Sequence, residues 1–133
     1  MTGRPEDELL GIGIDMERLD ALGRFDESAR RAFAERWFAA GELGIDPTAA
    51  TSPEALVAGM CCKEAVFKAV GGEAFAPAAI VVPRGEAGWG GRTTISLPDG
   101  GGAAVHVSCA CTGGHAVAVA VAWRGGGAAA PTG

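Results

Sequence analysis

Residues 52–71 constrain the fold most strongly, because they predict one long helix with well-defined ends. Ser52 is a favoured N-cap residue, since its hydroxyl can accept from a free backbone N–H of the first turn. Pro53 suits the first helical position, and Glu54 places an acid near the positive end of the helix dipole. Gly71 can end the helix in the left-handed conformation. We therefore expect a helix from about residue 53 to residue 70.

Two charged residues extend the apolar stripe of this helix. Leu56 and Met60 are followed at the same spacing by Glu64 and Lys68. Lys63 and Lys68 are also the only lysines among 11 basic residues. Charge on a core-facing stripe is costly unless it is paired or bound to a ligand. The stripe is therefore either part of a ligand site or an ordinary Glu–Lys pair on a partly exposed face.

The rest of the chain predicts an α+β domain in which the long helix packs on a mostly antiparallel sheet. Apolar runs typical of strands occupy residues 9–14, 78–82, 92–97, 103–110 and 115–123. A short helix or turn is expected at residues 19–25, an amphipathic helix at 29–38 capped by Asp26 or Ser28, and a loop at 41–51. We expect a single domain at residues 9–123, with residues 1–8 and 124–133 disordered.

Composition narrows the class of protein. The chain has 133 residues and a net charge of -5, so it is long enough for one core and lacks the basic excess of a nucleic-acid binder. No apolar run approaches the roughly 20 residues that span a bilayer, and the polar N-terminus is unlike a secretory signal. These features favour a cytoplasmic protein. We interpret its four cysteines as small buried residues, and the alternative is a redox or metal role.

Three acidic residues are candidates for a metal site. If the first strand stays extended past residue 14, its period of two places Asp15 and Glu17 on one face. Glu64 would lie on the helix packed nearby, and Mg²⁺ binds through a few carboxylates together with waters and substrate phosphates. Lys68, one turn beyond Glu64, could then reach a phosphate or a reacting hydroxyl. The simpler alternative is that Asp15 begins a turn where the strand meets solvent.

Four stretches of the sequence are similar to the 4′-phosphopantetheinyl transferase family, and most closely to its short holo-acyl-carrier-protein synthase branch. In order they read GIGID at residues 11–15, FAERWF at 33–38, KEAVFKAVG at 63–71 and AVHVS at 104–108. Together they span roughly residues 10–122. The resemblance implies the α+β fold of that family and transfer of the phosphopantetheine arm from coenzyme A to a serine of an acyl or peptidyl carrier protein.

The resemblance also implies roles for individual residues. Asp15 and Glu64 match the family's magnesium-binding acids, and Glu17 matches the Asp-x-Glu metal pair of the larger branch. Glu64 and Lys68 are the implied catalytic residues. Implied contacts to coenzyme A come from Lys63, Lys68, Ser108 and Cys111.

The implied partner is an acidic carrier protein, which suits a basic face. Arg24, Arg30 and Arg31 match the region that receives it, although such residues also form ordinary solvated helix faces. The short branch is typically a homotrimer with its sites between subunits, so we expect a homotrimer.

Two positions differ from the family pattern. Gly59 stands where the family has an arginine, and Cys111 stands where it has a histidine. These differences leave an alternative open, namely a homologue that lost transferase activity. Such a protein would bind carrier proteins or catalyse another reaction on a carrier-bound intermediate, with Cys111 as a possible nucleophile or acid.

Overall fold

The computed structural model describes residues 8–39, 42, 52–71, 76–85, 88–97 and 99–124. Its elements are β1 (Glu8–Arg18), α1 (Glu27–Trp37), α2 (Pro53–Val70), a short 3₁₀ helix η1 (Pro77–Ala79), β2 (Arg84–Gly85), β3 (Gly88–Ser96), β4 (Gly102–Thr112) and β5 (His115–Arg124). The predicted α+β class, with a long helix on an antiparallel sheet, is confirmed.

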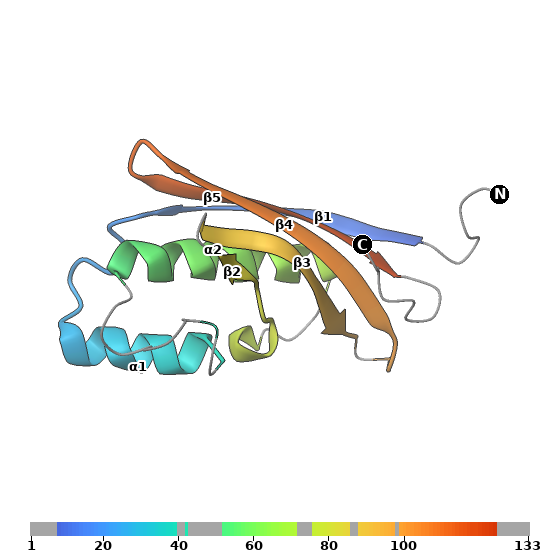
Figure 1. The fold of residues 1–133 in the computed structure, drawn as a ribbon, viewed down its shortest axis with the longest axis horizontal. Coiled ribbons are helices and arrows are strands. Elements are labelled where there is room, and N and C mark those ends of the chain that lie inside the picture. Colours follow the sequence, from blue (N-terminus) through green and yellow to red (C-terminus); the bar gives the residue numbers. More distant parts are fainter. Residues whose placement is uncertain are drawn as a thin grey trace.

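The strands form a sheet in the order β1-β5-β4-β3-β2, and all neighbouring strands are antiparallel. The N-terminal strand therefore lies beside the C-terminal one, as Figure 1 shows. Its register with β5 shifts between Leu9 and Gly11 and then continues without a break to the pair Arg18–His115. Because β1 stays extended to Arg18, Asp15 and Glu17 project to the same face of the sheet.

Helix α2 packs against one face of the sheet, and its ends are as the sequence predicts. The Ser52 hydroxyl accepts from the Ala55 amide at 3.1 Å, and Gly71 ends the helix at φ 72°. Glycine in β1 permits close approach of the helix. A Cβ atom on Gly13 would lie 1.9 Å from the carbonyl oxygen of Ala65. This contact fixes how far the acidic end of β1 lies from α2.

Helix α1 packs mainly against α2 and η1 on the side away from the sheet, so the sheet, α2 and α1 form successive layers (Figure 1). It begins at the predicted cap, because the Asp26 carboxylate accepts from the Ala29 amide at 2.8 Å. Residues 19–25 form turns, which is one of the two predicted alternatives. Phe33 stacks on Trp37 with ring centroids 5.4 Å apart, and both rings pack against the core.

The strand predicted at residues 78–82 is wrong. The chain forms η1 there and joins no sheet before Arg84. Proline at 77 and 83 removes backbone donors that a ladder requires. The amide of Val82 instead donates to the Glu42 carboxylate at 2.9 Å, while Ile80 and Val82 remain buried. Apolar side chains are therefore buried at this position without β pairing.

The ends of the described chain lie inside the sheet. Glu8 begins β1 and Arg124 ends β5, so both residues are ordered where the sequence predicts disorder. The other residues of the predicted disordered segments, and most of the loop predicted at 41–51, lie outside the described residues. Among the helices that the structure describes, none is long and apolar enough to span a membrane.

Candidate metal and phosphate site

Three carboxylates converge where β1 passes α2. Asp15, Glu17 and Glu64 each offer a ligand oxygen, and these oxygens all lie within 4.8 Å of one another. Asp15 is buried, whereas the other two are half-buried. The structure therefore brings together the three acids that the sequence proposes as metal ligands.

Lys68 lies at the edge of this carboxylate cluster. Its Nζ atom donates to Oδ1 of Asp15 at 3.0 Å and to the backbone carbonyl of Ile14 at 3.1 Å. The Lys68 side chain is 51% exposed, so the ammonium remains accessible to a ligand. The second oxygen of Asp15, Oδ2, is buried and has no hydrogen-bond partner among the described residues.

Mutual repulsion and burial alter the acidity of the cluster. Desolvation, reinforced by Asp15 and Glu64, raises the pKa of Glu17 from 4.5 to about 7. Desolvation and the charge of Asp15 also raise the pKa of Glu64. A nearby positive charge would therefore favour the ionised forms of Glu17 and Glu64.

A divalent cation fits this donor set. Three carboxylates at short separation, one of them with an unpartnered buried oxygen, supply the hard oxygen ligands that Mg²⁺ prefers. Lys68 provides a single positive charge against these three acids. Glu17 and Glu64 are only half-buried, so these two carboxylates can be reached from solvent.

Lys63 does not join this group. Its side chain is fully buried, and its ammonium donates to both oxygens of Glu42 at 2.9 and 3.0 Å, to the Pro77 carbonyl at 2.9 Å and to the Ile80 carbonyl. Burial lowers the pKa of Lys63, and the Glu42 carboxylate opposes that shift. We therefore leave Lys63 out of the proposed coenzyme contacts and assign it to the core.

The side chains of two aromatic residues fill the space beside Gly59. A Cβ atom at this position would lie 2.7 Å from Phe38 and 2.7 Å from Trp89. The Trp89 indole N–H donates to the Ala55 carbonyl at 2.8 Å, which fixes the ring against α2. A larger residue at position 59 would require these rings to move, so this chain uses the position for packing.

Ser108 and Cys111 lie on opposite faces of β4. Strand register aligns Cys111 with Ala116 and Glu17, so Cys111 lies on the face that bears the carboxylates, roughly 10 Å away across two strand spacings. Ser108 aligns with Val119 on the open face. Within one chain, the structure therefore does not bring Ser108 to the three acids.

The cysteines divide into buried and accessible residues. Cys61 and Cys62 are fully buried, as the sequence predicts. The prediction is wrong for the other two, because Cys109 is half-buried and Cys111 is exposed. The thiol of Cys61 donates to the backbone carbonyl of Asp15 at 3.3 Å. Cys61 therefore helps to fix the acidic segment of β1 against α2, a role for which the sequence gives no signal.

The three arginines proposed for docking lie at or near α1. Arg24 is exposed in the turn that follows β1, and Arg31 is exposed 3.9 Å from Glu27. Arg30 is half-buried and donates to the Phe25 carbonyl at 2.8 Å. Two of the three guanidinium groups are thus exposed, and Arg30 also stabilises the start of the helix.

Comparison with solved structures gives matches over nearly the whole fold. A holo-acyl-carrier-protein synthase from Bacillus anthracis, solved in complex with CoA (3′,5′-ADP), is 27% identical, covers 89% of this chain and 99% of its own, and gives a TM-score of 0.61. The enzyme from Neisseria meningitidis is 26% identical, covers 86% of this chain and 98% of its own, and gives a TM-score of 0.63. The acyl carrier protein synthase of Mycobacterium tuberculosis is 22% identical, covers 88% of this chain and 99% of its own, and gives a TM-score of 0.59. At this identity the match supports the fold alone.

No curated protein sequence matches the chain. The model of the 4′-phosphopantetheinyl transferase superfamily, however, matches residues 11–120, which include most of β1 with its acids, α2 and most of β5. The chain therefore belongs to the 4′-phosphopantetheinyl transferase superfamily.

Proposed function

We propose that this protein transfers the 4′-phosphopantetheine arm of coenzyme A to a serine of an acyl or peptidyl carrier protein, and that the reaction depends on magnesium. One observation carries the proposal: three carboxylates lie within 4.8 Å of one another beside an accessible lysine. The relative from Bacillus anthracis, which was solved with a coenzyme A fragment, supports the choice of donor.

Asp15, Glu17 and Glu64 would hold the metal ion. When bound, Mg²⁺ supplies positive charge that neutralises a diphosphate and stabilises the charge developing on its oxygens. The charge of the shared ion would also oppose the desolvation and the mutual repulsion that raise the pKa of Glu17 and Glu64.

The reaction joins the serine oxygen of the carrier to the phosphorus that bears the pantetheine arm. The bond from that phosphorus to the bridging oxygen breaks, and adenosine 3′,5′-bisphosphate leaves. Lys68 is placed to hold a phosphate oxygen, because its ammonium projects from α2 and is only partly engaged by Asp15. Glu64 orients the incoming hydroxyl and accepts its proton, directly or through water.

The carrier would dock near the start of α1. Arg24, Arg30 and Arg31 follow the acidic end of β1 closely along the chain and give this region positive charge. An acidic carrier protein is complementary to that surface, and such charges mainly increase the rate of association. A cytoplasmic location, where coenzyme A and carrier proteins occur together, belongs to the same proposal.

We also propose that the protein assembles as a homotrimer through the open face of its sheet. The face opposite α2 exposes large apolar side chains, namely Leu9, Ile12, Ile14, Met16, Val119 and Trp123. Strand register aligns Ile12 with Val121 and Ile14 with Val119, so the patch is continuous across β1 and β5. A continuous apolar patch of this kind is typical of a surface that a partner covers. Further copies of the chain are the proposed partner.

Intact mass spectrometry of a carrier protein tests the transferase function. An apo carrier is incubated with the protein, coenzyme A and Mg²⁺, and the expected result is a carrier heavier by one phosphopantetheine group. If carriers bind but none gains that mass, the protein is instead a carrier-binding homologue without transferase activity, and the Cys111 thiol becomes the group to investigate.

A further inference from the structure

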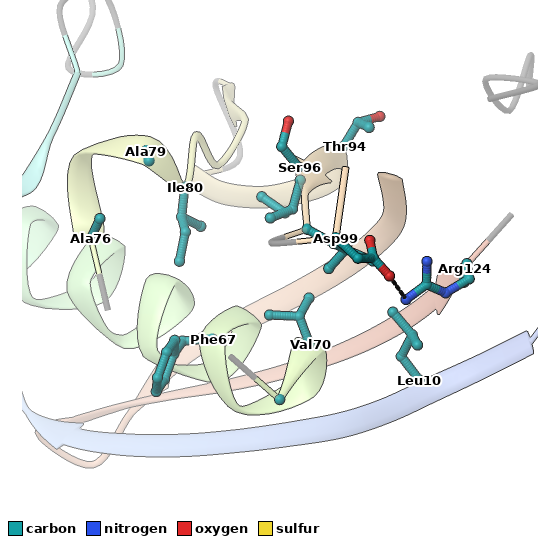
Figure 2. Close-up of a pocket in the computed structure, with 13 residues that line it drawn as sticks. Leu10, Phe67, Val70, Ala76, Ala79, Ile80, Thr94, Ser96, Asp99 and Arg124 are labelled. Carbon is teal, nitrogen blue, oxygen red and sulfur yellow. Dashed lines mark ion pairs between the residues drawn. The ribbon is translucent and has the colours of Figure 1, made fainter. Parts of the chain in front are cut away.

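A cavity of about 860 Å³ lies at the C-terminal end of α2. Its lining residues come from β1, α2, η1, β3 and the end of β5, as Figure 2 shows, and most of the lining is apolar. The apolar lining side chains include those of Leu10, Phe67, Val70, Ile80, Ile95 and Leu97. Cavities of this size and character are typical of small-molecule sites.

The charges around the cavity favour a neutral occupant. Arg124 supplies the positive charge of the described lining, and its guanidinium is paired with Asp99 at 2.9 Å and with Glu8 at 3.7 Å. The C-terminal end of α2, at Val70 and Gly71, also lines the cavity, and this is the negative end of the helix dipole. A phosphate or carboxylate would therefore be poorly stabilised inside, whereas an aliphatic chain would be desolvated favourably.

The cavity begins beside the reacting centre, at Phe67, and extends away from it along β1 to Leu10. Leu10, on its wall, is five residues before Asp15 on the extended strand β1, which corresponds to roughly 16 Å. Phe67, on another wall, directly precedes Lys68 on α2. The pantetheine arm, with two amide groups between its phosphate and its sulfur, is about as long as five residues of extended chain, or roughly 16 Å.

From this match we propose that the cavity binds the acyl chain of an acyl-coenzyme A thioester, so that the preferred donor is an acylated coenzyme A. The inference rests on the proposed function. In the transfer, the serine oxygen bonds to phosphorus, adenosine 3′,5′-bisphosphate leaves, the serine proton passes to Glu64 or water, and the thioester bond stays intact. The product is a carrier that already bears the acyl group.

Binding without any carrier tests the cavity independently of transfer. Calorimetry compares coenzyme A with its acetyl, butanoyl, hexanoyl and octanoyl thioesters at the same magnesium concentration. Affinity is expected to rise up to about fourfold for each methylene that enters the cavity. The octanoyl thioester of N-acetylcysteamine, which carries no phosphate, should bind. Free octanoate should bind more weakly, because the Arg124 guanidinium in the described lining is already paired with Asp99 and Glu8.

A matched pair of valine variants locates the binding. Val70→Trp places a bulky ring in the cavity. It should abolish the increase in affinity with acyl chain length while leaving the affinity for coenzyme A unchanged. Val81→Trp places the same bulk at an exposed position outside the lining and should retain the gain. Circular dichroism confirms that both variants fold. If Val70→Trp does not fold, Ile95→Phe is used in its place.

Equal affinities for coenzyme A and octanoyl-coenzyme A would overturn the proposal. It would also be overturned if the gain with chain length survived in Val70→Trp, because the chain would then bind elsewhere. If the N-acetylcysteamine thioester binds but no carrier is modified, the cavity assignment stands and the transferase function fails. If carriers are modified equally well with coenzyme A and with its acyl thioesters, the transferase function stands and the cavity assignment fails.

Discussion

The ammonium of Lys68 lies 3.0 Å from Oδ1 of Asp15, so a residue of α2 and a residue of β1 are joined at the mouth of the carboxylate cluster. The other Asp15 oxygen has no partner among the described residues. Under the proposed function, this arrangement would leave one side of Asp15 for a metal ion, and Lys68 would contact the incoming phosphate.

Replacing Lys68 with methionine should reduce transfer far more than stability. The side chain is half-exposed, so its ion pair contributes at most about 1 kcal/mol to the free energy of unfolding. A positioned cation that stabilises developing charge typically accounts for a 10²- to 10³-fold effect on rate, and we expect a loss of about that size in kcat/KM. Steady-state kinetics and urea unfolding measure the two effects. A variant that keeps the wild-type rate would exclude Lys68 from the reaction.

The metal-free protein should become more stable as the pH falls from about 7 to 4.5. Over this range folded Glu17 binds a proton that the unfolded chain has released, because its pKa is raised from 4.5 to about 7. Asp20 and Asp99, whose pKa values are lowered from 3.8, oppose this trend only at more acidic pH.

Thermal unfolding in a chelator measures this pH dependence, and Glu17→Gln should flatten the profile. Adding Mg²⁺ should raise the melting temperature more at pH 8 than at pH 6, since protons and the ion compete for the same oxygens. A wild-type melting temperature that falls steadily from pH 7 to pH 5 would be inconsistent with the raised pKa.

Breaking the buried pair of Lys63 and Glu42 should destabilise the fold strongly. Lys63→Met leaves the Glu42 carboxylate buried with two backbone amides and no cation, which typically costs about 3–5 kcal/mol. Adding Glu42→Gln removes the uncompensated charge and should recover part of the loss. Urea unfolding of the two single variants and the double variant gives the coupling energy between Lys63 and Glu42. Additive effects on the free energy of unfolding would show that the two residues contribute independently of each other, against the prediction.

Placing a charge on the open sheet face should dissociate the proposed trimer. Ile12 is 59% exposed and is flanked by other apolar side chains, so Ile12→Glu would bury a carboxylate in the subunit interface. Native mass spectrometry should show a trimer for the wild type and a monomer for this variant. Val81→Glu, which adds the same charge at an exposed site away from that face, should remain trimeric. A monomeric wild type would refute the assembly.

Local signals in the sequence were sufficient to predict helix α2 and the shared face of Asp15 and Glu17. Ser52 and Gly71 are short-range capping residues, and each makes the backbone contact that its chemistry favours. The period of two places Asp15 and Glu17 on one face, since β1 extends to Arg18 and pairs with β5 throughout that segment. Convergence of these two acids with Glu64 followed from the packing of α2 on β1.

Other features depended on long-range partners that no local pattern encodes. The run at 78–82 has strand-like composition, but the donor of Val82 is satisfied by Glu42, a residue 40 positions away. The family resemblance implies a coenzyme contact for Lys63, whereas its side chain is fully buried and paired with the same distant carboxylate of Glu42. The lining of the cavity at the end of α2 combines residues of five elements, so it could not be derived from any one segment.

The central claim is magnesium-dependent transfer at the carboxylate cluster, and Glu64→Gln tests it most directly. This change keeps the shape of the side chain and removes its negative charge, while Glu54→Gln makes the same change at an exposed position in the first turn of α2. Intact mass of an apo carrier after incubation with coenzyme A, at increasing Mg²⁺, is the measurement. We predict modification by the wild type and Glu54→Gln that requires Mg²⁺, and at least a hundredfold slower modification by folded Glu64→Gln. Equal modification by Glu64→Gln, or full activity of the wild type in a chelator, would contradict the account.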